Sequence, residues 1–325
     1  MTKTAFLFSG QGAQYFGMGR DLAEKYPIVD QTFNEASEIL GIDMKKLCFE
    51  ENEQLNLTQY TQPAILTVSV AILRLLSEYQ IQPEAVMGLS LGEYTALVAS
   101  EVLDFPTALK IVAKRGLYMT QAAPTGTGKM VAIMNAPIET IEECCQKASH
   151  LGVVAPANYN TPNQIVIGGE VDAVDEAVTL LHRAGVKRMI ELNVSGPFHT
   201  ALLRPAGRNL HDLFQRVAFH APKIPVISNT TAKVMPKEEI AHLLELQVQS
   251  SVRFYESIAT LQSMGITEMI EVGPGKVLSG FIKKIDKSIQ LFRVENEETL
   301  QVLLAEKENK RGKNGIKRTN SIYHR

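Results

Sequence analysis

The chain has little cysteine, no tryptophan and no strong excess of either charge. Only three cysteines occur among its 325 residues. Cys144 and Cys145 are neighbours, which is poor geometry for a disulfide framework, and no C-x-x-C pair suggests a zinc site. The formal net charge of −2 argues against a nucleic-acid-binding protein, because such proteins normally show a basic excess.

The sequence also shows no pattern typical of a signal peptide or of a membrane span. The first eight residues carry one lysine and a very short apolar run, which does not resemble a signal peptide. No apolar stretch approaches the length of a membrane span. We therefore expect a cytoplasmic protein that binds neither membrane nor nucleic acid. With 45% hydrophobic and 21% charged residues, the chain can bury a large core.

Strand and helix patterns alternate along most of the chain, which predicts an α/β fold with a large, mostly parallel sheet of the α/β-hydrolase-like type. Pro63 is expected in the first turn of its helix, and Asp104 is expected to cap the helix that follows it. Strand patterns cover residues 4–8, 85–88, 225–228 and 268–272. Helical patterns cover residues 28–40, 63–79, 91–100, 105–121, 201–216, 252–264 and 277–285.

The segment between the two halves of this pattern has a different order of predicted elements. Its order of strands and helices is β-α-β-β-α-β, which predicts a small inserted ferredoxin-like subdomain over residues 127–196. The large catalytic domain is then discontinuous, covering residues 1–126 and 197–303. Residues 304–325 are basic and almost without apolar side chains, so we expect a disordered tail, with docking of an acidic partner as the alternative.

The most informative motif is Gly88-Leu89-Ser90-Leu91-Gly92. It reads G-x-S-x-G, and it lies between a short apolar strand pattern and a helical pattern. A tight turn in this context exposes a nucleophilic serine at the carboxyl end of a sheet. The helix that follows aims its free N–H groups at the place where an oxyanion would develop. A glycine-rich loop that happens to contain a serine is the alternative.

A serine hydroxyl needs an adjacent base, and His199 is the best candidate among seven histidines. It follows the rigid turn Ser195-Gly196-Pro197-Phe198 and comes after the serine in chain order. No acidic residue stands out as the partner of the imidazole, so a backbone carbonyl could orient it instead. Arg115, at the end of an amphipathic helix, is either a solvated cation or an inward clamp for a carboxylate.

Together these motifs resemble the malonyl-CoA:acyl carrier protein transacylases of bacterial fatty acid synthesis. The resemblance covers residues 3–300 in order. It rests on the segments at 8–14, 61–64, 88–94, 114–116, 158–168, 195–199, 228–230 and 271–278. Leu89 stands where that family usually has histidine, and Ser9 where proline is common. The resemblance implies a ping-pong acyltransferase that needs no metal or redox cofactor.

Carried over residue by residue, the resemblance implies Ser90 as the acylated nucleophile and His199 as the general base. Arg115 would bind the free carboxylate of the malonyl group. The backbone N–H groups of Gln11 and Leu91 would form the oxyanion hole.

Two further roles follow from the same resemblance. The backbone carbonyl of Gln247 would orient the histidine ring, although Gln249 lies only two residues away. Phe198 would contribute to the selection of malonyl groups, because with Phe at this position the motif matches the form associated with malonyl selectivity. The implied partners are malonyl-CoA and acyl carrier protein, and the implied state is a monomer. A serine hydrolase and a non-catalytic scaffold that binds carrier protein are the competing hypotheses, and the pathway served is either fatty acid or polyketide synthesis.

Overall fold

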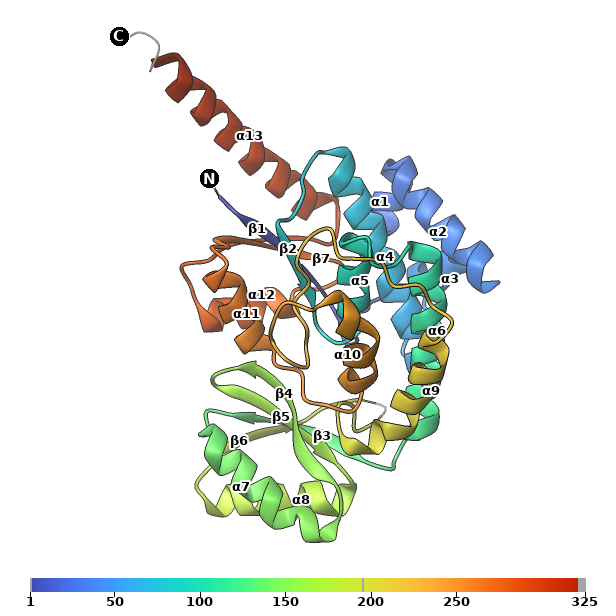
Figure 1. Ribbon diagram of the computed structural model, residues 1–325, viewed down its shortest axis with the longest axis vertical. Coiled ribbons are helices and arrows are strands. Elements are labelled where there is room, and N and C mark those ends of the chain that lie inside the picture. The colour runs from blue at the N-terminus through green and yellow to red at the C-terminus, as the bar shows by residue number, and fades with distance from the viewer. Residues whose placement is uncertain (1, 195, 321–325) are drawn as a thin grey trace.

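The structure is a computed structural model that describes residues 2–194 and 196–320. Figure 1 shows two bodies, each built on its own sheet. The larger sheet has four parallel strands in the order β2-β1-β7-β8. Its strands are β1 (Thr4–Phe8), β2 (Ala85–Gly88), β7 (Glu268–Val272) and β8 (Gln290–Val294). The predicted α/β class is therefore confirmed.

One strand of the prediction is wrong, and one strand was missed. Residues 225–228 form only isolated bridges, from Val226 to Val86 and from Ile227 to Val234. Pairing stops there because the chain turns back at once, with the N–H of Ala232 donating to the carbonyl of Ser228. The missed strand is β8, an edge strand whose mostly half-buried residues give a weak pattern.

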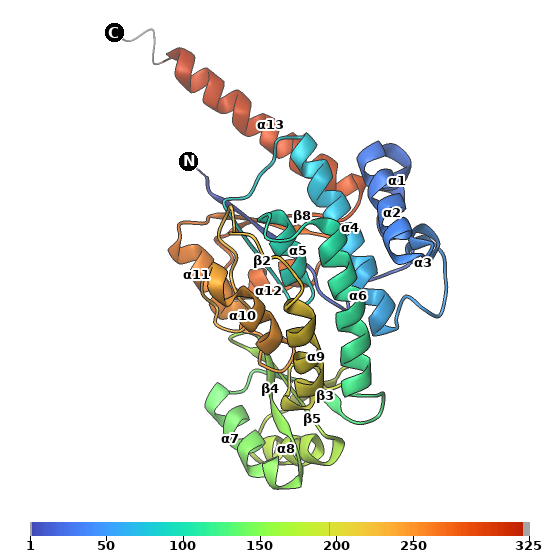
Figure 2. The same cartoon turned by 45° about the vertical axis from the view of Figure 1, so that its right-hand side comes forward.

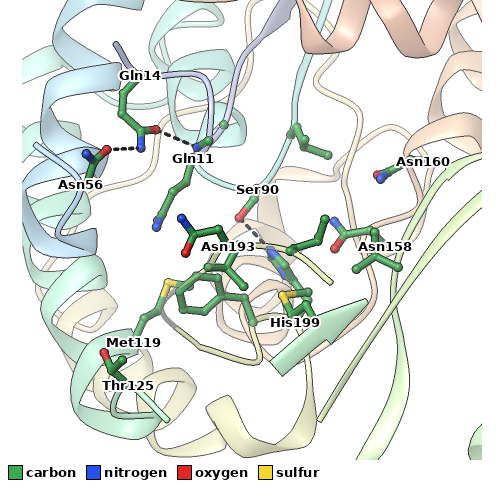
Figure 3. A pocket seen from close by; sticks show the side chains of 18 residues that line it. Gln11, Gln14, Asn56, Ser90, Met119, Thr125, Asn158, Asn160, Asn193 and His199 are labelled. Carbon is green, nitrogen blue, oxygen red and sulfur yellow. Dashed lines mark hydrogen bonds between the residues drawn. The ribbon is translucent and has the colours of Figure 1, made fainter. Parts of the chain in front are cut away.

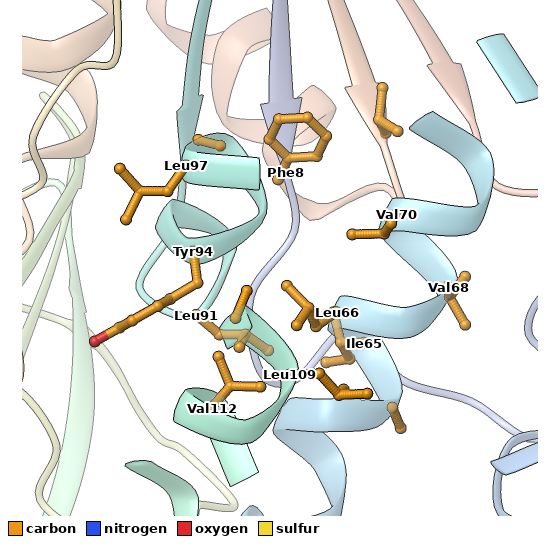
Figure 4. Close-up of a cluster of buried hydrophobic side chains, with 14 of the residues drawn as sticks. Phe8, Ile65, Leu66, Val68, Val70, Leu91, Tyr94, Leu97, Leu109 and Val112 are labelled. Atoms are coloured by element: carbon orange, nitrogen blue, oxygen red, sulfur yellow. The ribbon is translucent and has the colours of Figure 1, made fainter. Parts of the chain in front are cut away.

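Helices cover both faces of the large sheet, and the alternation along β1 decides which side chain meets which layer. Phe6 and Phe8 pack into the cluster formed with α4, α5 and α6, part of which Figure 4 shows. Ala5 and Leu7 point to the opposite face, against α11 and α12. The bounds are α4 (Thr58–Glu78), α5 (Gly92–Ala99), α6 (Phe105–Ala122), α11 (Phe254–Ser263) and α12 (Val277–Ile285).

Most of the remaining helices of the large body lie around this core, while the last helix of the chain extends away from it (Figure 2). Asp104 caps α6 as predicted, because its side chain accepts a 2.8 Å hydrogen bond from the N–H of Thr107. The other helices are α1 (Arg20–Lys25), α2 (Pro27–Leu40), α3 (Met44–Phe49), α9 (Arg204–Phe214), α10 (Ile240–Gln247) and α13 (Glu297–Asn320).

Helix α4 corrects two expectations. It begins at Thr58, so Pro63 lies inside the helix and not in its first turn. The earlier start is supported by Thr61, whose hydroxyl donates to the carbonyl of Leu55 at 2.6 Å. By length and composition α4 is also apolar enough to span a membrane, contrary to the sequence analysis. Of its most apolar window, 78% is buried inside the protein, as for a core helix.

The smaller sheet is antiparallel, with the strand order β4-β5-β3-β6. Two helices cover one of its faces, and their apolar side chains form a core of their own (Figure 1). The separate βαββαβ unit predicted from the sequence is thus present. Its elements are β3 (Lys129–Met134), α7 (Ile138–Ala148), β4 (Val154–Thr161), β5 (Gln164–Gly169), α8 (Val171–Arg183) and β6 (Arg188–Glu191).

Within the described residues, the segment expected to be a disordered tail continues a helix. Helix α13 continues to Asn320, while residues 321–325 lie outside the described part. Leu300 and Leu303, near the start of this helix, are buried. Further along, Lys307 and Lys310 both donate to the buried carboxylate of Glu268. Composition alone could not show that these basic side chains have a specific acidic partner.

Candidate active site

Ser90 lies in a sharp turn between β2 and α5, and its backbone is strained. Its φ of +53° is unusual for a residue other than glycine, as expected at a nucleophile turn. The glycines around it allow a close approach of the backbone. A Cβ on Gly88 would lie 2.0 Å from the carbonyl carbon of Gly92, and one on Gly92 would lie 2.1 Å from the oxygen of Phe8. No larger side chain fits at either position.

These contacts predict a strong effect of Gly92→Ala on stability. Because the methyl group would meet backbone atoms that cannot rotate away, we expect the free energy of unfolding to fall by about 3 kcal/mol or more. Denaturant unfolding followed by circular dichroism measures this. Gly280→Ala, in α12, is the matched control, since a Cβ added there would meet no described neighbour within 4 Å. The control should leave stability unchanged or raise it by about 0.5–1 kcal/mol. Equal stability of the two variants would contradict the prediction.

The side chain of Asn229 holds the backbone of the turn that contains Ser90. The N–H of Ser90 donates to Asn229 Oδ1 at 2.6 Å, and Asn229 Nδ2 donates to the carbonyl of Gly88 at 2.6 Å. The backbone N–H of Asn229 donates in turn to Glu93 Oε1 at 2.8 Å. The side chain of Asn229 is buried, so water does not compete for these bonds. The strained turn is therefore fixed by a buried amide that lies 139 residues away along the chain.

His199 reaches Ser90 from the segment that leads out of the small subdomain. Its Nε2 lies 2.8 Å from Ser90 Oγ, as Figure 3 shows, and its Nδ1 lies 2.8 Å from the backbone carbonyl oxygen of Gln247. Because a carbonyl only accepts, Nδ1 carries the proton, and the free lone pair of Nε2 accepts from the serine hydroxyl. This backbone carbonyl belongs to Gln247, the residue that the family resemblance implied for the orienting role, and not to Gln249.

Burial keeps the imidazole of His199 neutral. Desolvation lowers the pKa of His199 to about 4, and the positive charge of Arg115 acts in the same direction, against the hydrogen bonds to the backbone of Gln247 and Ser250. The base is thus unprotonated at neutral pH, as accepting a proton from Ser90 requires. Its φ of +59° shows that the backbone is strained at this residue as well.

Arg115 is buried beside the same hydroxyl and is not solvated. Its Nη2 donates to Ser90 Oγ at 3.0 Å and to Gln247 Oε1 at 2.9 Å, while its Nη1 donates to Gln62 Oε1 at 2.8 Å. Its guanidinium carbon lies 5.5 Å from the centre of the Tyr94 ring. Burial lowers the pKa of Arg115, but a guanidinium stays protonated at neutral pH. The site therefore holds a fixed positive charge within 3.0 Å of the hydroxyl.

The two backbone amides expected to bind an oxyanion belong to Gln11, which lines the same cavity as Ser90, and to Leu91, which follows Ser90 in the chain. Gln11 follows β1 in the turn that lines the cavity, and Leu91 is the residue just before α5. Within residues 2–194 and 196–320, neither backbone N–H donates to a protein acceptor. The side chain of Gln11 is held away by Thr58, whose Oγ1 accepts from Gln11 Nε2 at 3.0 Å. Both amides are thus available to a bound group.

A cavity of about 670 Å³ opens above the serine, between the large body and the small sheet. Ser90, His199, Gln11 and Phe198 line it, whereas Arg115 lies behind Ser90, outside the lining. Leu89, the departure from the family pattern, also lines it, and its side chain takes part in none of the hydrogen bonds described for Ser90. The other lining side chains include Gln14, Asn56, Met119, Thr125, Asn158, Asn160 and Asn193, labelled in Figure 3.

The geometry agrees with what comparison with known proteins shows. A family model described as the acyl transferase domain matches residues 5–319. The chain belongs to the acyl transferase family. The malonyl CoA-acyl carrier protein transacylase of Bacillus subtilis (strain 168) is 43% identical to this acyltransferase over 307 residues, which cover 94% of this chain and 97% of the relative.

Solved structures are similar over the same length. A crystal structure of MCAT from Streptococcus pneumoniae is 60% identical to this acyltransferase, with a TM-score of 0.92, and covers 94% of this chain and 100% of that chain. Another structure is a type II PKS acyl-carrier protein in complex with its malonyl-transacylase. It is 39% identical, with a TM-score of 0.91, and covers 94% of this chain and 100% of that chain.

Three residues of the acyltransferase site were not assigned a role from the sequence. Gln62 and Asn229 lie in segments that carried the family resemblance, but nothing in their spacing showed that they hold Arg115 and Ser90. Glu93 follows the serine motif directly and is 1% exposed. A carboxylate in an otherwise apolar helix start was the available signal for Glu93, and only the fold shows what it contacts.

Proposed function

We propose that this acyltransferase moves a malonyl group from malonyl-CoA to the phosphopantetheine thiol of an acyl carrier protein through a malonyl ester on Ser90. One observation carries the proposal. The same serine hydroxyl lies 2.8 Å from the unprotonated nitrogen of His199 and 3.0 Å from the guanidinium of Arg115. The first contact activates a nucleophile, and the second favours an acyl group that ends in a negative charge.

In the first half-reaction, Ser90 Oγ attacks the thioester carbonyl and His199 Nε2 takes the hydroxyl proton. The negative oxygen that forms is stabilised by the N–H groups of Gln11 and Leu91. Arg115 transfers a hydrogen bond from the hydroxyl to the free carboxylate of the acyl group. The carbon–sulfur bond then breaks, and CoA leaves with the proton that His199 returns.

In the second half-reaction, the thiol of the carrier protein attacks the ester on Ser90, and His199 takes the thiol proton. The ester bond breaks, and the proton returns to Ser90 Oγ, so the enzyme is regenerated. The solved complex between a relative and an acyl-carrier protein supports this kind of acceptor. No electrons are exchanged, and the groups named supply every proton transfer, so we propose that neither a metal nor a redox cofactor takes part.

We propose that the enzyme supplies malonyl units for fatty acid synthesis, that it works in the cytoplasm and that it acts as a monomer. The site itself supports the last point, since Ser90, His199, Arg115, Gln11 and Leu91 all come from one chain. One of the solved relatives is bound to a type II PKS acyl-carrier protein, which makes polyketide synthesis the alternative pathway.

The test is intact mass spectrometry of the protein after brief exposure to malonyl-CoA, followed by peptide mapping. We expect one malonyl adduct, on Ser90, that disappears when an acyl carrier protein bearing phosphopantetheine is added and reappears on that carrier. Free malonate without any carrier would favour a serine hydrolase. A protein that takes up no adduct would favour a scaffold that binds carrier protein, and an adduct on another residue would overturn the proposed mechanism.

The lowered pKa of His199 leads to a prediction about its protonation. Nitrogen-15 spectra of the imidazole rings should show His199 as the neutral ring protonated at Nδ1 down to about pH 5, since its pKa is lowered to about 4. His199→Gln assigns the signal by its loss. Because the unfolded chain binds this proton at a higher pH than the folded protein, the contribution of His199 to stability should fall as the pH drops from 6.5 towards 4, which comparison of wild type with His199→Gln isolates. A doubly protonated ring at pH 6 would contradict the prediction.

A further inference from the structure

Glu93 is an acidic side chain that is buried close to the nucleophile. It is in the first turn of α5, 1% exposed, and within the described residues no lysine, arginine or histidine forms an ion pair with it. Burying a carboxylate in this way is costly unless its oxygens are well satisfied. Its position three residues after Ser90 suggests that the cost serves the site.

Both oxygens of Glu93 accept hydrogen bonds from donors that cannot act as acceptors. Oε1 accepts from the backbone N–H of Asn229 at 2.8 Å, and Oε2 accepts from Gln247 Nε2 in a short contact. Burial raises the pKa of Glu93 to about 7, while these two bonds and the charge of Arg115 act to lower it. At about pH 8 the side chain is therefore ionised and acts only as an acceptor.

Three contacts decide which way round the Gln247 amide lies, and Glu93 makes one of them. Gln247 Nε2 donates to Glu93 Oε2 and also to the carbonyl of Ser90 at 2.9 Å, so the NH₂ end faces two acceptors. The oxygen end then faces Arg115 and accepts a hydrogen bond from its Nη2 at 2.9 Å. If the amide were reversed, donors would face each other at Arg115, and oxygens would face each other at Ser90 and at Glu93. An ionised Glu93 thus adds to the contacts that exclude the reversed amide.

We propose that Glu93 is a positioning residue that fixes the orientation of the Gln247 amide and, through it, holds the Arg115 guanidinium beside Ser90. Its carboxylate thereby sets the preference for acyl groups that end in a carboxylate. This inference rests on the proposed function, because it assigns to Glu93 a part in the selectivity of that same site. Glu93 itself does not contact the acyl group.

Replacement by glutamine has a specific consequence. Both partners of Glu93 are donors, whereas a glutamine side chain has one acceptor end and one donor end. The backbone N–H of Asn229 cannot turn, so it would keep the new oxygen. The new NH₂ would then face the NH₂ of Gln247. The Gln247 amide must either turn, which presents donors to Arg115, or move away, which takes its oxygen from Arg115. Glu93→Gln, although nearly identical in shape, therefore disturbs Arg115. Glu93→Asp has a shorter side chain, but that side chain still only accepts hydrogen bonds, so it does not place a donor against Gln247.

The experiment compares Glu93→Gln, Glu93→Asp and the wild-type protein at about pH 8, using acylation of Ser90 by malonyl-CoA and by acetyl-CoA. We expect Glu93→Gln to lower kcat/KM for malonyl-CoA on the order of 10–100-fold, mainly through KM, and to leave acetyl-CoA within about threefold. Glu93→Asp should keep the ratio of the two substrates close to that of wild type, even if both rates fall.

Several outcomes separate this inference from its alternatives. Equal losses for both substrates in Glu93→Gln would indicate a purely structural role and overturn the proposal, as would an unchanged ratio. If Glu93→Gln does not fold, a lost malonyl preference in Glu93→Asp would still overturn it. Glu101→Gln, an exposed change beside the end of α5, is the matched control and should alter neither substrate. A wild-type protein that takes up no malonyl group would refute the proposed function itself.

Discussion

Replacement of His199 by alanine is expected to slow the formation of the malonyl ester on Ser90 on the order of 10⁴-fold or more. In the structure the proton on Ser90 Oγ points to a neutral nitrogen 2.8 Å away, and no other described side chain offers an unprotonated base to that oxygen. Without the imidazole the proton must go to water. Stopped-flow measurement of CoA release in a single turnover gives the rate directly.

Two variants frame this prediction. Ser90→Ala removes the oxygen that is acylated, so it gives the background rate of CoA release in the absence of an ester. His211→Ala removes a histidine that is exposed and bound to Glu245, so it should leave acylation unchanged. Binding should survive in His199→Ala, because Arg115 keeps its contacts with Gln62 and Gln247. Acylation at a wild-type rate in His199→Ala would mean that the serine is activated by some other group.

The sequence predicted the nucleophile well because its geometry is local. A strand, a turn with small residues on either side of the serine and a helix are all encoded within residues 85–99. The fold confirms this strand, turn and helix, with a positive φ at Ser90. The capped helix at 105–122 and the inserted βαββαβ unit were also predictable, because each depends on short-range patterns bounded by residues that typically start or end an element.

The residues that surround the nucleophile were not predictable in the same way, because their roles depend on contacts between distant segments. Asn229, Glu93 and Gln247 form one hydrogen-bonded group around Ser90 only once β2, α5 and α10 lie together. The orienting partner of His199 is a backbone carbonyl, and every residue has one. Spacing and chemistry alone could therefore not indicate which residue supplies it, and only the family resemblance pointed to Gln247.

The start of α4 was predicted wrongly because local signals compete. The sequence placed it at Pro63 because proline favours the first turn, but the helix begins at Thr58, and a side-chain bond from Thr61 to Leu55 supports the earlier start. The tail was judged from its charge alone, whereas Lys307 and Lys310 bind a carboxylate of β7 that is far away in sequence. Only in the tail does a contact between distant segments outweigh a local preference.

Arg115→Ala is expected to lower kcat/KM for malonyl-CoA by about 100-fold or more, and to raise the use of acetyl-CoA relative to malonyl-CoA. The reason is the buried guanidinium 3.0 Å from Ser90 Oγ, which would face the malonyl carboxylate and has no counterpart to bind in an acetyl group. Arg115→Lys keeps the charge but loses the planar fork, so its preference should lie between wild type and alanine. Parallel acylation assays with the two CoA esters measure the ratio.

The ratio of substrates, and not the absolute rate, is the decisive quantity for Arg115. Its removal also leaves the oxygens of Gln62 and Gln247 without their donor, which slows both substrates alike and cancels in the ratio. An unchanged ratio would remove Arg115 from carboxylate binding. The double variant Arg115→Ala with Glu93→Gln gives a further check. If Glu93 acts on selectivity only through the arginine, the double variant should lose no more malonyl preference than Arg115→Ala alone. A further loss in the double variant would show that Glu93 acts on the substrate by a separate route.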